Sequence, residues 1–427
     1  SGHPVFADPL GLNRPCRLLQ WLYGHKLANF FWSSRCISHT KLFDMRLIDH
    51  TMCVAVKGTV GKPDYCVQAT TVDDMFWSGG DKPLKALREH WSSIVTIGYE
   101  PRVTKYAGIT FDWTPTSFTM SQTDTIIEMC ARHGIDKSYK GYTYSTPLPT
   151  AFAIRVEDSP STPDPKQVKR AQAWVGELGW LATKCRPDIL YAVSILARIQ
   201  LNPGELHFTM MLRVTIYLWS TRHLCLTYRK GPWLGPDGFQ YDTYDCAYFP
   251  DAAVGIADNY HSQSGYCSMM SGCYVAGKSI KQSIVADSSG YAETICLTDS
   301  THDGIERLRF LQGLGLPIKF VFINEDNTAA IVVCKKGLGP RSLHWNIKVM
   351  YIKEQENIGL ICLRKLATAT QPGDIFTKIL EPSSFIRHRT YLFGGGPQVY
   401  HDARVGVWQD PTPELLELYH RFAASRQ

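Results

Sequence analysis

Four acidic side chains at the expected ends of strands and helices constrain this chain most. Asp245 falls in a predicted central strand, and Asp326 follows an apolar run typical of a buried strand. Glu293 and Asp374 stand where helices are expected to begin. Carboxylates are preferred ligands of hard divalent cations, and a pair of such ions can support hydrolysis of a phosphodiester. Any one of these acids taken alone is more often a surface side chain or a helix cap.

Short motifs surround these acids and occur in a fixed order. They are Tyr244-Asp245, Ser264-Gly265-Tyr266, Lys281-Gln282, Ser288-Ser289 with Ala292-Glu293, Asp326-Asn327 with Ala330-Ile331, Arg341-Ser342 with His344, and Asp374-Ile375 with Thr377-Lys378. In order and spacing, the region from Tyr241 to Leu380 resembles the ribonuclease H domain of copia-type LTR retrotransposon Pol polyproteins. Ala247 and Tyr248 depart from the family, which has an Asp and a Trp there.

The resemblance implies a catalytic role and a chemistry. It places Asp245, Glu293, Asp326 and Asp374 as the four catalytic carboxylates, which bind two Mg²⁺ (or Mn²⁺) ions. The implied reaction is hydrolysis of the RNA strand of an RNA–DNA hybrid, without reading of sequence. His344 lies near this site by resemblance, where product release and a role as a helix-start or core histidine stay open alternatives.

The first 157 residues carry a second set of motifs. In chain order they are Leu22-Tyr23-Gly24 with Lys26 and Ala28, Val72-Asp73-Asp74-Met75, Gly108-Ile109, Ser121-Gln122 and Ser145-Thr146-Pro147. They resemble the palm of a copia-type reverse transcriptase, which implies that Asp73 and Asp74 bind metal. The family's further palm Asp lies before the segment that this chain matches, and polymerase chemistry needs it. The chain alone is therefore not expected to polymerise DNA, and another polypeptide is expected to complete or cover the palm.

Residues 166–234 concentrate positive charge. They hold ten Lys or Arg against three acids, an excess larger than the +6 of the whole chain. Apolar spacing predicts helices over 171–180, 187–199 and 205–219, and the unit resembles the thumb and connection of the same family. Such a surface suits a phosphate backbone, whereas a solvated helix face or a protein contact explains the charge equally well. The candidate nucleic-acid-binding residues are Lys166, Lys169, Arg170, Lys184, Arg186, Arg213, Arg222, Arg229 and Lys230.

Composition sets the broad class of the protein. Its hydrophobic content of 44% and charged content of 20% are typical of globular proteins. No run approaches the ~18 apolar residues of a membrane span, and no signal peptide pattern opens the chain. Thirteen Cys without C-x-x-C pairs indicate reduced thiols, an intracellular compartment and no zinc site. A chain that begins with Ser is expected to be a piece or a processed product.

These patterns together predict a multidomain α+β or α/β protein. The expected domains are a partial reverse transcriptase palm (1–157), a helical thumb/connection (158–236), a ribonuclease H-like mixed sheet with flanking helices (237–381) and a C-terminal tail (382–427). The favoured function is a retrotransposon-derived reverse transcriptase/ribonuclease H fragment with metal-dependent endonuclease activity. The alternative is a non-catalytic scaffold that binds RNA–DNA hybrid or structured RNA within a larger nucleoprotein complex. The four carboxylates favour the first for the nuclease half, and the missing palm Asp favours the second for the polymerase half.

Overall fold

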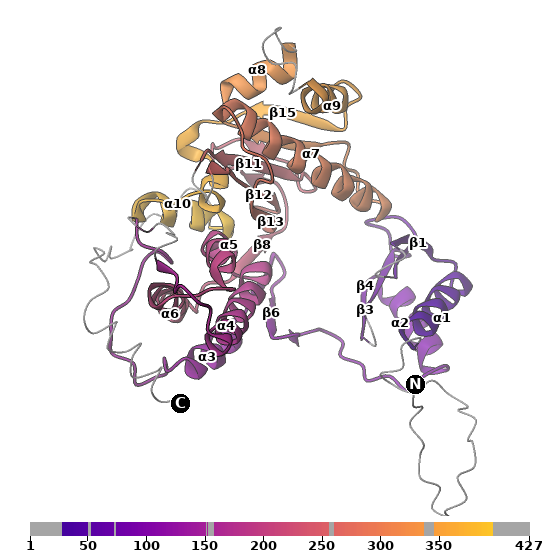
Figure 1. Ribbon diagram of the computed structural model, residues 1–427. Helices are drawn as coiled ribbons and strands as arrows, with labels where there is room; N and C mark the ends of the chain where they lie inside the picture. The colour runs from indigo at the N-terminus through magenta and orange to yellow at the C-terminus, as the bar shows by residue number, and fades with distance from the viewer. Residues whose placement is uncertain are drawn as a thin grey trace, which may run out of the picture. The chain divides into compact units, whose positions relative to one another are not determined.

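The computed structural model describes residues 28–49, 53–71, 74–150, 152, 158–255, 260–336 and 346–395 (Figure 1). Helices and sheets are both abundant, which confirms the predicted multidomain α+β class. The chain forms two compact units: residues up to Tyr99 with Phe310–Leu316, and the remainder. This division falls inside the predicted palm region, and the predicted domain boundaries stay predictions.

The first unit is built on an antiparallel sheet with the strand order β1-β2-β3-β4. The strands are β1 (Arg46–Asp49), β2 (Val54–Lys57), β3 (Cys66–Thr71) and β4 (Asp74–Gly79), and the helices are α1 (Ala28–Leu42) and α2 (Asp81–Ser92). Alternate residues of β3 are buried, and the Trp91 indole on α2 donates to the Gln68 Oε1 on this face at 3.0 Å. Thr71 pairs with Asp74 where β3 and β4 meet. Strand β4 is therefore an edge of this sheet among the described residues.

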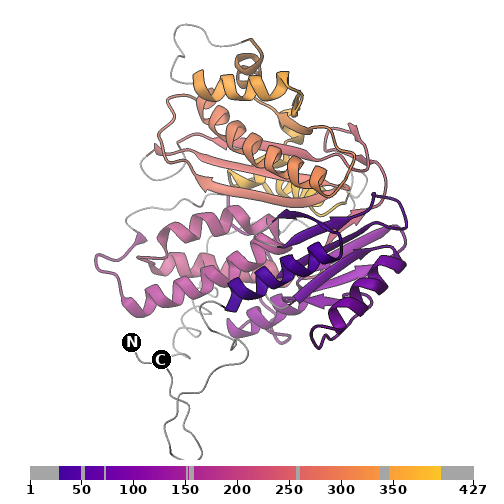
Figure 2. The same ribbon diagram turned by 90° about the vertical axis from the view of Figure 1, so that its right-hand side faces the viewer.

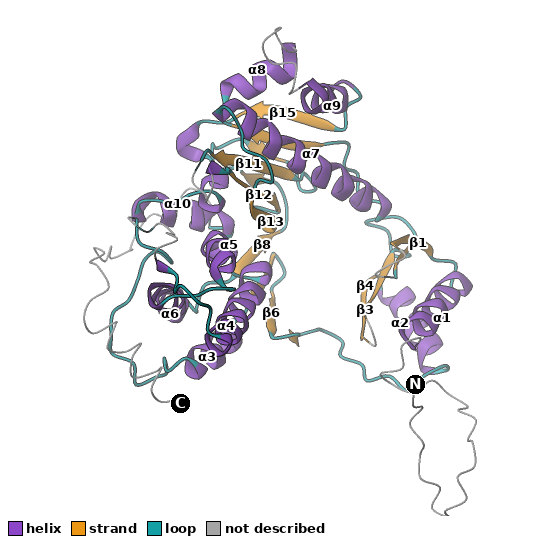
Figure 3. Ribbon diagram, viewed as in Figure 1, coloured by secondary structure: helices purple, strands orange, loops and turns teal. Residues whose placement is uncertain are grey.

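In the second unit, a helical layer shares one apolar core with two sheets (Figure 3). The helices are α3 (Thr123–Arg132), α4 (Pro165–Lys184), α5 (Leu190–Ile199) and α6 (Glu205–Ser220), and the smaller sheet has the order β5-β6-β7-β8. Its strands are β5 (Lys105–Tyr106), β6 (Ile109–Trp113), β7 (Ser117–Ser121) and β8 (Leu226–Arg229). The three helices expected from apolar spacing are confirmed as α4, α5 and α6. Helix α4 begins at Pro165 because the Asp164 side chain accepts from the Lys166 amide at 2.9 Å.

The larger sheet of this unit has five strands in the order β13-β12-β11-β14-β15. The strands are β11 (Ala247–Ala253), β12 (Gln263–Met270), β13 (Cys273–Lys281), β14 (Val321–Glu325) and β15 (Ile361–Lys365), and the short pair β9 (Trp233–Leu234) and β10 (Gln240–Tyr241) precedes them. β12 pairs antiparallel with both β11 and β13, whereas β14 pairs parallel with β11 on one side and with β15 on the other. The predicted mixed sheet is therefore present, with β11 at its centre.

Helices and one short turn surround this sheet. Helix α7 (Ser289–Gly313) lies across one face, where Gly304 approaches Val321 and Tyr248 (Figure 2). Helices α8 (Thr328–Lys336) and α9 (Asn346–Asn357) lie near β14 and β15, and α10 (Pro382–Leu392) packs near β13 (Figure 1). The 3₁₀ turn η6 (Pro372–Phe376) packs against β11 and β12. This arrangement brings the centre of β11, the start of α7, the end of β14 and η6 to one place.

Candidate active site

Three carboxylates from three different elements meet at the end of the central strands. Asp251 comes from β11, Glu293 from the first turns of α7, and Asp326 follows the last residue of β14. One oxygen from each carboxylate lies within 4.8 Å of the others. Asp251 and Glu293 are buried and Asp326 is half-buried. Three oxygen donors at this spacing fit a hard divalent cation such as Mg²⁺ or Mn²⁺.

Two glycines allow η6 to bring Asp374 against this group. Gly265 pairs with Asp251 across β11 and β12, and a Cβ at Gly265 would lie 2.6 Å from the Phe376 Cβ. A Cβ at Gly373 would lie 2.7 Å from the Phe249 carbonyl oxygen and 3.0 Å from the Asp251 Cβ. Any larger residue at either position would push η6 away from the sheet, and Asp374 with it.

Polar side chains hold the elements of the site in register. The Gln282 amide donates to the Ser264 hydroxyl at 2.8 Å and to the Ala292 carbonyl at 2.9 Å, which ties the start of α7 to β12. Beyond β14, the Asn327 side chain accepts from the Ala330 amide at 3.1 Å and so caps α8. These residues belong to the sequence motifs, and their role is to position the carboxylates.

Thr377 and Lys378 bind the outer side of the carboxylate group. The Thr377 hydroxyl donates to Asp251 Oδ2. The Lys378 ammonium lies 2.7 Å from Asp374 Oδ1 and 3.7 Å from Asp251 Oδ2. Asp251 and Asp374 therefore share one positively charged partner, the Lys378 ammonium group.

Glu325, the last residue of β14, is a buried acid that the sequence reasoning missed. It is fully buried, and its Oε1 accepts from the Asn327 amide at 2.8 Å. Its Oε2 has no hydrogen-bond partner among the described residues, and the same holds for the Glu293 Oε2. The signal was present in the sequence, because Glu325 lies two residues after the apolar run Phe320–Ile323 and directly before Asp326.

Burial and mutual repulsion shift the protonation of this group toward the neutral forms. Burial raises the pKa of Glu293 well above its usual range, and the carboxylates of Glu325 and Asp251 raise it further. Burial also raises the pKa of Asp251, against the opposing effect of Lys378. Burial and the neighbouring Asp251 raise the pKa of Asp374 to about 7. A cation among these carboxylates would favour their ionised forms.

The predicted position of Asp245 on the central strand is wrong. Strand β11 begins two residues later, at Ala247, and Asp245 lies in the preceding turn, where its Oδ2 accepts from the Asp242 amide at 2.8 Å. Asp251, six residues further along the chain, occupies the place expected for Asp245. The other three predicted carboxylates, Glu293, Asp326 and Asp374, are brought together with it.

The remaining predicted metal and product-release residues lie elsewhere or outside the described chain. Asp74 is exposed at the start of β4 and belongs to the first unit. Asp73 and His344 lie outside the described residues. Their predicted roles stay predictions.

Part of the basic segment lines a surface hollow on the helical layer. Lys166, Lys169 and Arg170 on α4 border a hollow of about 420 Å³ together with Arg132, His133 and Glu177. Glu177 accepts from the Arg132 Nε at 2.9 Å and lies 2.6 Å from the His133 Nε2. The lysines at the rim are exposed.

Two predicted nucleic-acid-binding arginines are instead structural. Arg186 is completely buried and holds Asp188 through two hydrogen bonds, at 2.9 and 2.7 Å. Arg213 is 2% exposed, and its guanidinium lies 3.8 Å from the centre of the Tyr144 ring. Burial removes both from reach of a nucleic acid backbone, which corrects the prediction for these two residues.

The other basic candidates keep some exposure. Lys184 and Lys230 are exposed, and the Lys184 ammonium lies 4.9 Å from the centre of the Trp180 ring. Arg222 is half-buried and donates to the Trp219 carbonyl at 2.6 Å, while Arg229 donates to the Gly394 carbonyl. Their predicted contact with nucleic acid stays a prediction.

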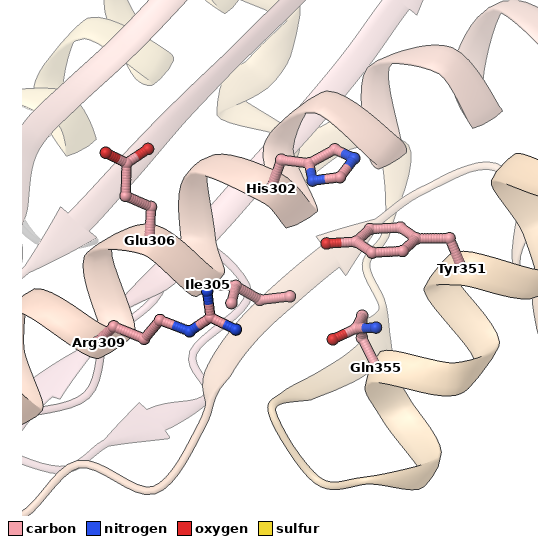
Figure 4. Close-up of a pocket in the computed structure, with 6 residues that line it drawn as sticks. All are labelled: His302, Ile305, Glu306, Arg309, Tyr351 and Gln355. Atoms are coloured by element: carbon pink, nitrogen blue, oxygen red, sulfur yellow. The ribbon is translucent and has the colours of Figure 1, made fainter.

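A separate pocket of about 440 Å³ lies between α7 and α9 (Figure 4). His302 and Tyr351 stack across it, with ring centres 4.3 Å apart, and Arg309 and Gln355 line it further along the helices. None of the clustered carboxylates lines this pocket.

No described helix is long and apolar enough to cross a membrane.

Comparison with known proteins identifies transposon polyproteins as relatives, whereas no protein-family model matches the chain. The Retrovirus-related Pol polyprotein from transposon TNT 1-94 of Nicotiana tabacum is 27% identical over 378 residues, covering 87% of this chain and 27% of that protein. A putative transposon Ty5-1 protein of Saccharomyces cerevisiae is 26% identical over 301 residues, covering 70% of this chain and 92% of that protein. The Transposon Ty1-ER2 Gag-Pol polyprotein of the same yeast is 22% identical over 391 residues, covering 88% of this chain and 22% of that protein. The chain thus spans about a quarter of the two polyproteins.

Solved structures similar to part of the chain include two ribonucleases H1. The enzyme from Halobacterium salinarum NRC-1 aligns with a TM-score of 0.25 at 13% identity, over 30% of this chain and 90% of that one. LC11-RNase H1, solved in complex with an RNA/DNA hybrid, aligns with a TM-score of 0.23 at 13% identity, over 31% of this chain and 94% of that one.

Proposed function

The homologues of this chain are Ty/copia-type Pol polyproteins over most of its length, and we propose that its carboxylate centre is a ribonuclease H-type nuclease that hydrolyses the RNA strand of RNA–DNA hybrids. The observation that carries this proposal is the convergence of Asp251, Glu293 and Asp326 on one point, with Asp374 beside them. These four residues are the proposed catalytic carboxylates.

The donor set fits a divalent cation held by oxygen ligands. Asp251, Glu293 and Asp326 would hold it, and the buried Glu293 Oε2, which has no partner among the described residues, supports this assignment. When bound, Mg²⁺ or Mn²⁺ supplies Lewis acidity, which makes water a better nucleophile and stabilises charge on phosphate oxygens. Two ions per site, as the resemblance implies, stay a prediction.

The protein's own residues position the reacting groups. Thr377 fixes the orientation of the Asp251 carboxylate through its hydroxyl, and Gln282 fixes the helix start that carries Glu293. Gly265 lets η6 approach, so that Asp374 lies next to Asp251. Because these contacts form within the folded domain, the carboxylates do not need to rearrange before substrate binds.

The proposed substrate is recognised by its backbone and not by its bases. The hollow bordered by Lys166, Lys169 and Arg170 supports phosphate contacts, which are sequence-independent and sensitive to salt. The 2′-hydroxyl is the local feature that distinguishes an RNA strand from a DNA strand. We therefore expect cleavage to require RNA in one strand and to be insensitive to its sequence.

The polymerase half is proposed to be inactive in this chain alone. Asp74 lies at the edge strand β4, in a sheet that has no further paired strand beyond it among the described residues. Unpaired strand edges are normally covered in native proteins. This supports the proposal that another polypeptide completes or covers the palm sheet.

The decisive experiment compares two aspartates six residues apart. In an assay with labelled RNA–DNA hybrid and Mg²⁺, Asp251→Asn should reduce cleavage by about 10³-fold or more, because one metal-binding oxygen is lost. Asp245→Asn is the matched control, since Asp245 lies in a turn outside the carboxylate group, and should retain wild-type cleavage within about twofold. Hybrid binding should persist in both variants.

The scaffold function makes the opposite prediction in the same assay. A scaffold would bind the hybrid with strong salt dependence but would not cleave it at any Mg²⁺ or Mn²⁺ concentration. Loss of cleavage in Asp245→Asn with retention in Asp251→Asn would instead show that the carboxylate centre is not the nuclease.

A further inference from the structure

Gln371 is a buried amide at the junction of three elements of the proposed nuclease centre. It is completely buried and directly precedes η6. Its Nε2 donates to the Pro250 carbonyl of β11 at 2.9 Å and to the Asn324 carbonyl of β14 at 3.2 Å. Its Oε1 accepts from the Gly373 amide of η6 at 3.1 Å. Both hydrogens of this side-chain amide and its oxygen are therefore bonded to backbone groups of three different elements.

Each of these backbone partners stands directly before an acid at the site. The pairs are Pro250 before Asp251, Asn324 before Glu325, and Gly373 before Asp374. Asp326 follows Glu325 immediately, so the contact with β14 also holds the backbone that leads to Asp326. A single side chain thus bonds the chain next to the acids of β11, β14 and η6.

The amide of Gln371 lies where β11 and β14 stop pairing. The two strands pair only at Ala247 with Phe322 and at Tyr248 with Ile323. Beyond these pairs, the Nε2 of Gln371 bridges one carbonyl on each strand. The amide therefore sets the distance between the strands where the acids begin, and η6 is tied to the same amide.

We propose that Gln371 is a positioning residue of the nuclease centre, whose side-chain amide fixes the separation of β11 and β14 and the placement of η6 against both strands. The oxygens of Asp251 and Asp326 thereby lie within 4.8 Å of each other and of Glu293. The inference rests on the proposed function, in that it takes the centre to bind metal and to cleave hybrid. It adds the residue through which three separate elements reach one geometry.

The centre is more sensitive to a small displacement than the fold is. Loss of the Gln371 amide leaves the Pro250 and Asn324 carbonyls without this donor, which lowers stability. The sheet keeps its ladder bonds to β12 and β15, so the domain stays folded while the strand ends shift. Mg²⁺ demands a near-ideal octahedral arrangement of oxygen ligands, and a misplacement of about 1 Å costs about 10²-fold in rate. Cleavage and metal binding should therefore suffer far more than folding.

Replacing Gln371 separates these effects. Gln371→Met keeps the length of the side chain and removes its hydrogen bonds, whereas Gln371→Asn keeps an amide on a shorter side chain. In the assay with labelled RNA–DNA hybrid and Mg²⁺, kcat should fall about 10²-fold in Gln371→Met and about tenfold or more in Gln371→Asn. KM for the hybrid should stay within about threefold of wild type, because the proposed phosphate contacts lie on the helical layer.

Gln122→Met is the matched control. Gln122 is also a buried amide, and its Oε1 accepts from the Cys185 backbone amide at 3.1 Å within the helical layer. Its replacement should lower the Tm by several degrees, as Gln371→Met does, but should leave kcat within about twofold of wild type. A merely structural role of Gln371 would make the two variants alike in both measurements.

A second measurement follows metal binding without cleavage. Mn²⁺ that binds the folded chain and not the unfolded one raises the Tm, and this rise is measured on the full chain without nucleic acid. We expect the rise to be smaller by about threefold or more in Gln371→Met than in wild type, and unchanged in Gln122→Met. Circular dichroism shows whether each variant is folded before its values are used.

Specific outcomes overturn the proposal. A wild-type kcat in folded Gln371→Met refutes the positioning role while the proposed function stands, and so does an equal loss of kcat in Gln122→Met. Failure of both Gln371 variants to fold also overturns it, because Gln371 is then needed for the fold alone. If the wild type does not cleave the hybrid, the proposed function fails, whereas a Mn²⁺ response that is lost in Gln371→Met still supports the positioning role. If the wild type shows neither cleavage nor a Mn²⁺ response, both fail.

Discussion

Replacing Asp374 by Asn should stabilise the metal-free protein, although it removes a proposed catalytic group. Burial and the Asp251 carboxylate raise the pKa of Asp374 from 3.8 to about 7. A carboxyl whose pKa is higher in the folded state binds its proton there more tightly than in the unfolded chain. As pH rises from about 4 to about 7, ionisation of Asp374 therefore lowers the free energy of unfolding progressively. Above that range the ionised carboxylate destabilises the fold by a constant amount. Asn has a similar shape and never ionises.

The magnitude follows from the pKa. A change from 3.8 to about 7 corresponds to about 4 kcal/mol of unfolding free energy above pH 7. Asp251 interacts strongly with Asp374, and either carboxyl can hold a shared proton, so the variant recovers only part of this. We expect Asp374→Asn to gain about 2 kcal/mol at pH 8, which raises the Tm by several degrees. At pH 4.5 the gain should be about a quarter as large.

Thermal unfolding in a metal chelator at pH 4.5 and pH 8 measures this difference. Asp124→Asn is the matched control, because Asp124 forms an ion pair at 2.9 Å with Lys105 in which both side chains are exposed. Its unfolding free energy should change by less than about 0.5 kcal/mol at both pH values. A Tm for Asp374→Asn at or below wild type at pH 8, or a gain independent of pH, would refute the assignment of electrostatic strain to this centre.

Two further predictions concern the packing around the site. Gly265→Ala places a Cβ 2.6 Å from the Phe376 Cβ of η6, so it should lower the Tm and should reduce hybrid cleavage at least tenfold. Gly176→Ala, in open space on α4, should leave cleavage unchanged and raise stability by up to about 1 kcal/mol. Equal effects of the two substitutions on cleavage would contradict the close approach of η6. Arg186→Met leaves Asp188 buried without its cation and should cost about 3–5 kcal/mol in chemical denaturation, and Arg186→Met with Asp188→Asn should recover part of that loss. A single variant within about 1 kcal/mol of wild type would disprove the structural role.

The sequence predicted the mixed sheet and the helices around the carboxylates, because these signals are local. Glu293 near a helix start and Asp326 at a strand end follow from apolar periodicity, and both placements agree with α7 and β14. The helices α4, α5 and α6 follow from apolar residues at helical spacing. Such patterns depend only on which face of an element is buried.

The choice between Asp245 and Asp251 could not be made from local pattern. The strand carrying Asp251 contains Pro250, which has no amide hydrogen to donate and normally indicates a strand edge or start. Here β14 pairs with β11 only at Ala247 and Tyr248, so no ladder bond to β14 needs the missing amide hydrogen, and the Pro250 carbonyl accepts from the Gln371 side chain at 2.9 Å. That contact joins residues 121 positions apart, and no nearby residue signals it.

The prediction that the basic segment contacts nucleic acid was wrong for two residues, because a count of charges does not show which side chains the fold buries. A count of charges treats Arg186 and Arg213 like Lys166 and Lys169, yet the first two are buried and the others exposed. Arg186 is two residues from Asp188, and this spacing could have indicated an ion pair. Arg213 lies in an apolar helix without a nearby acid, and only the fold shows that it packs on Tyr144.

The motifs around the acids turn out to be as informative as the acids themselves. Gly265 and Gly373 permit the close approach of η6, Gln282 ties α7 to β12, and Thr377 orients Asp251. None of these residues can hold a metal ion by a carboxylate, yet each is needed for carboxylates from distant parts of the chain to converge. Gly265 and Gly373 are needed for the packing of η6 whether or not the centre cleaves nucleic acid. Hybrid cleavage by the Asp251→Asn and Asp245→Asn variants, and not the packing, therefore distinguishes the proposed nuclease from a scaffold.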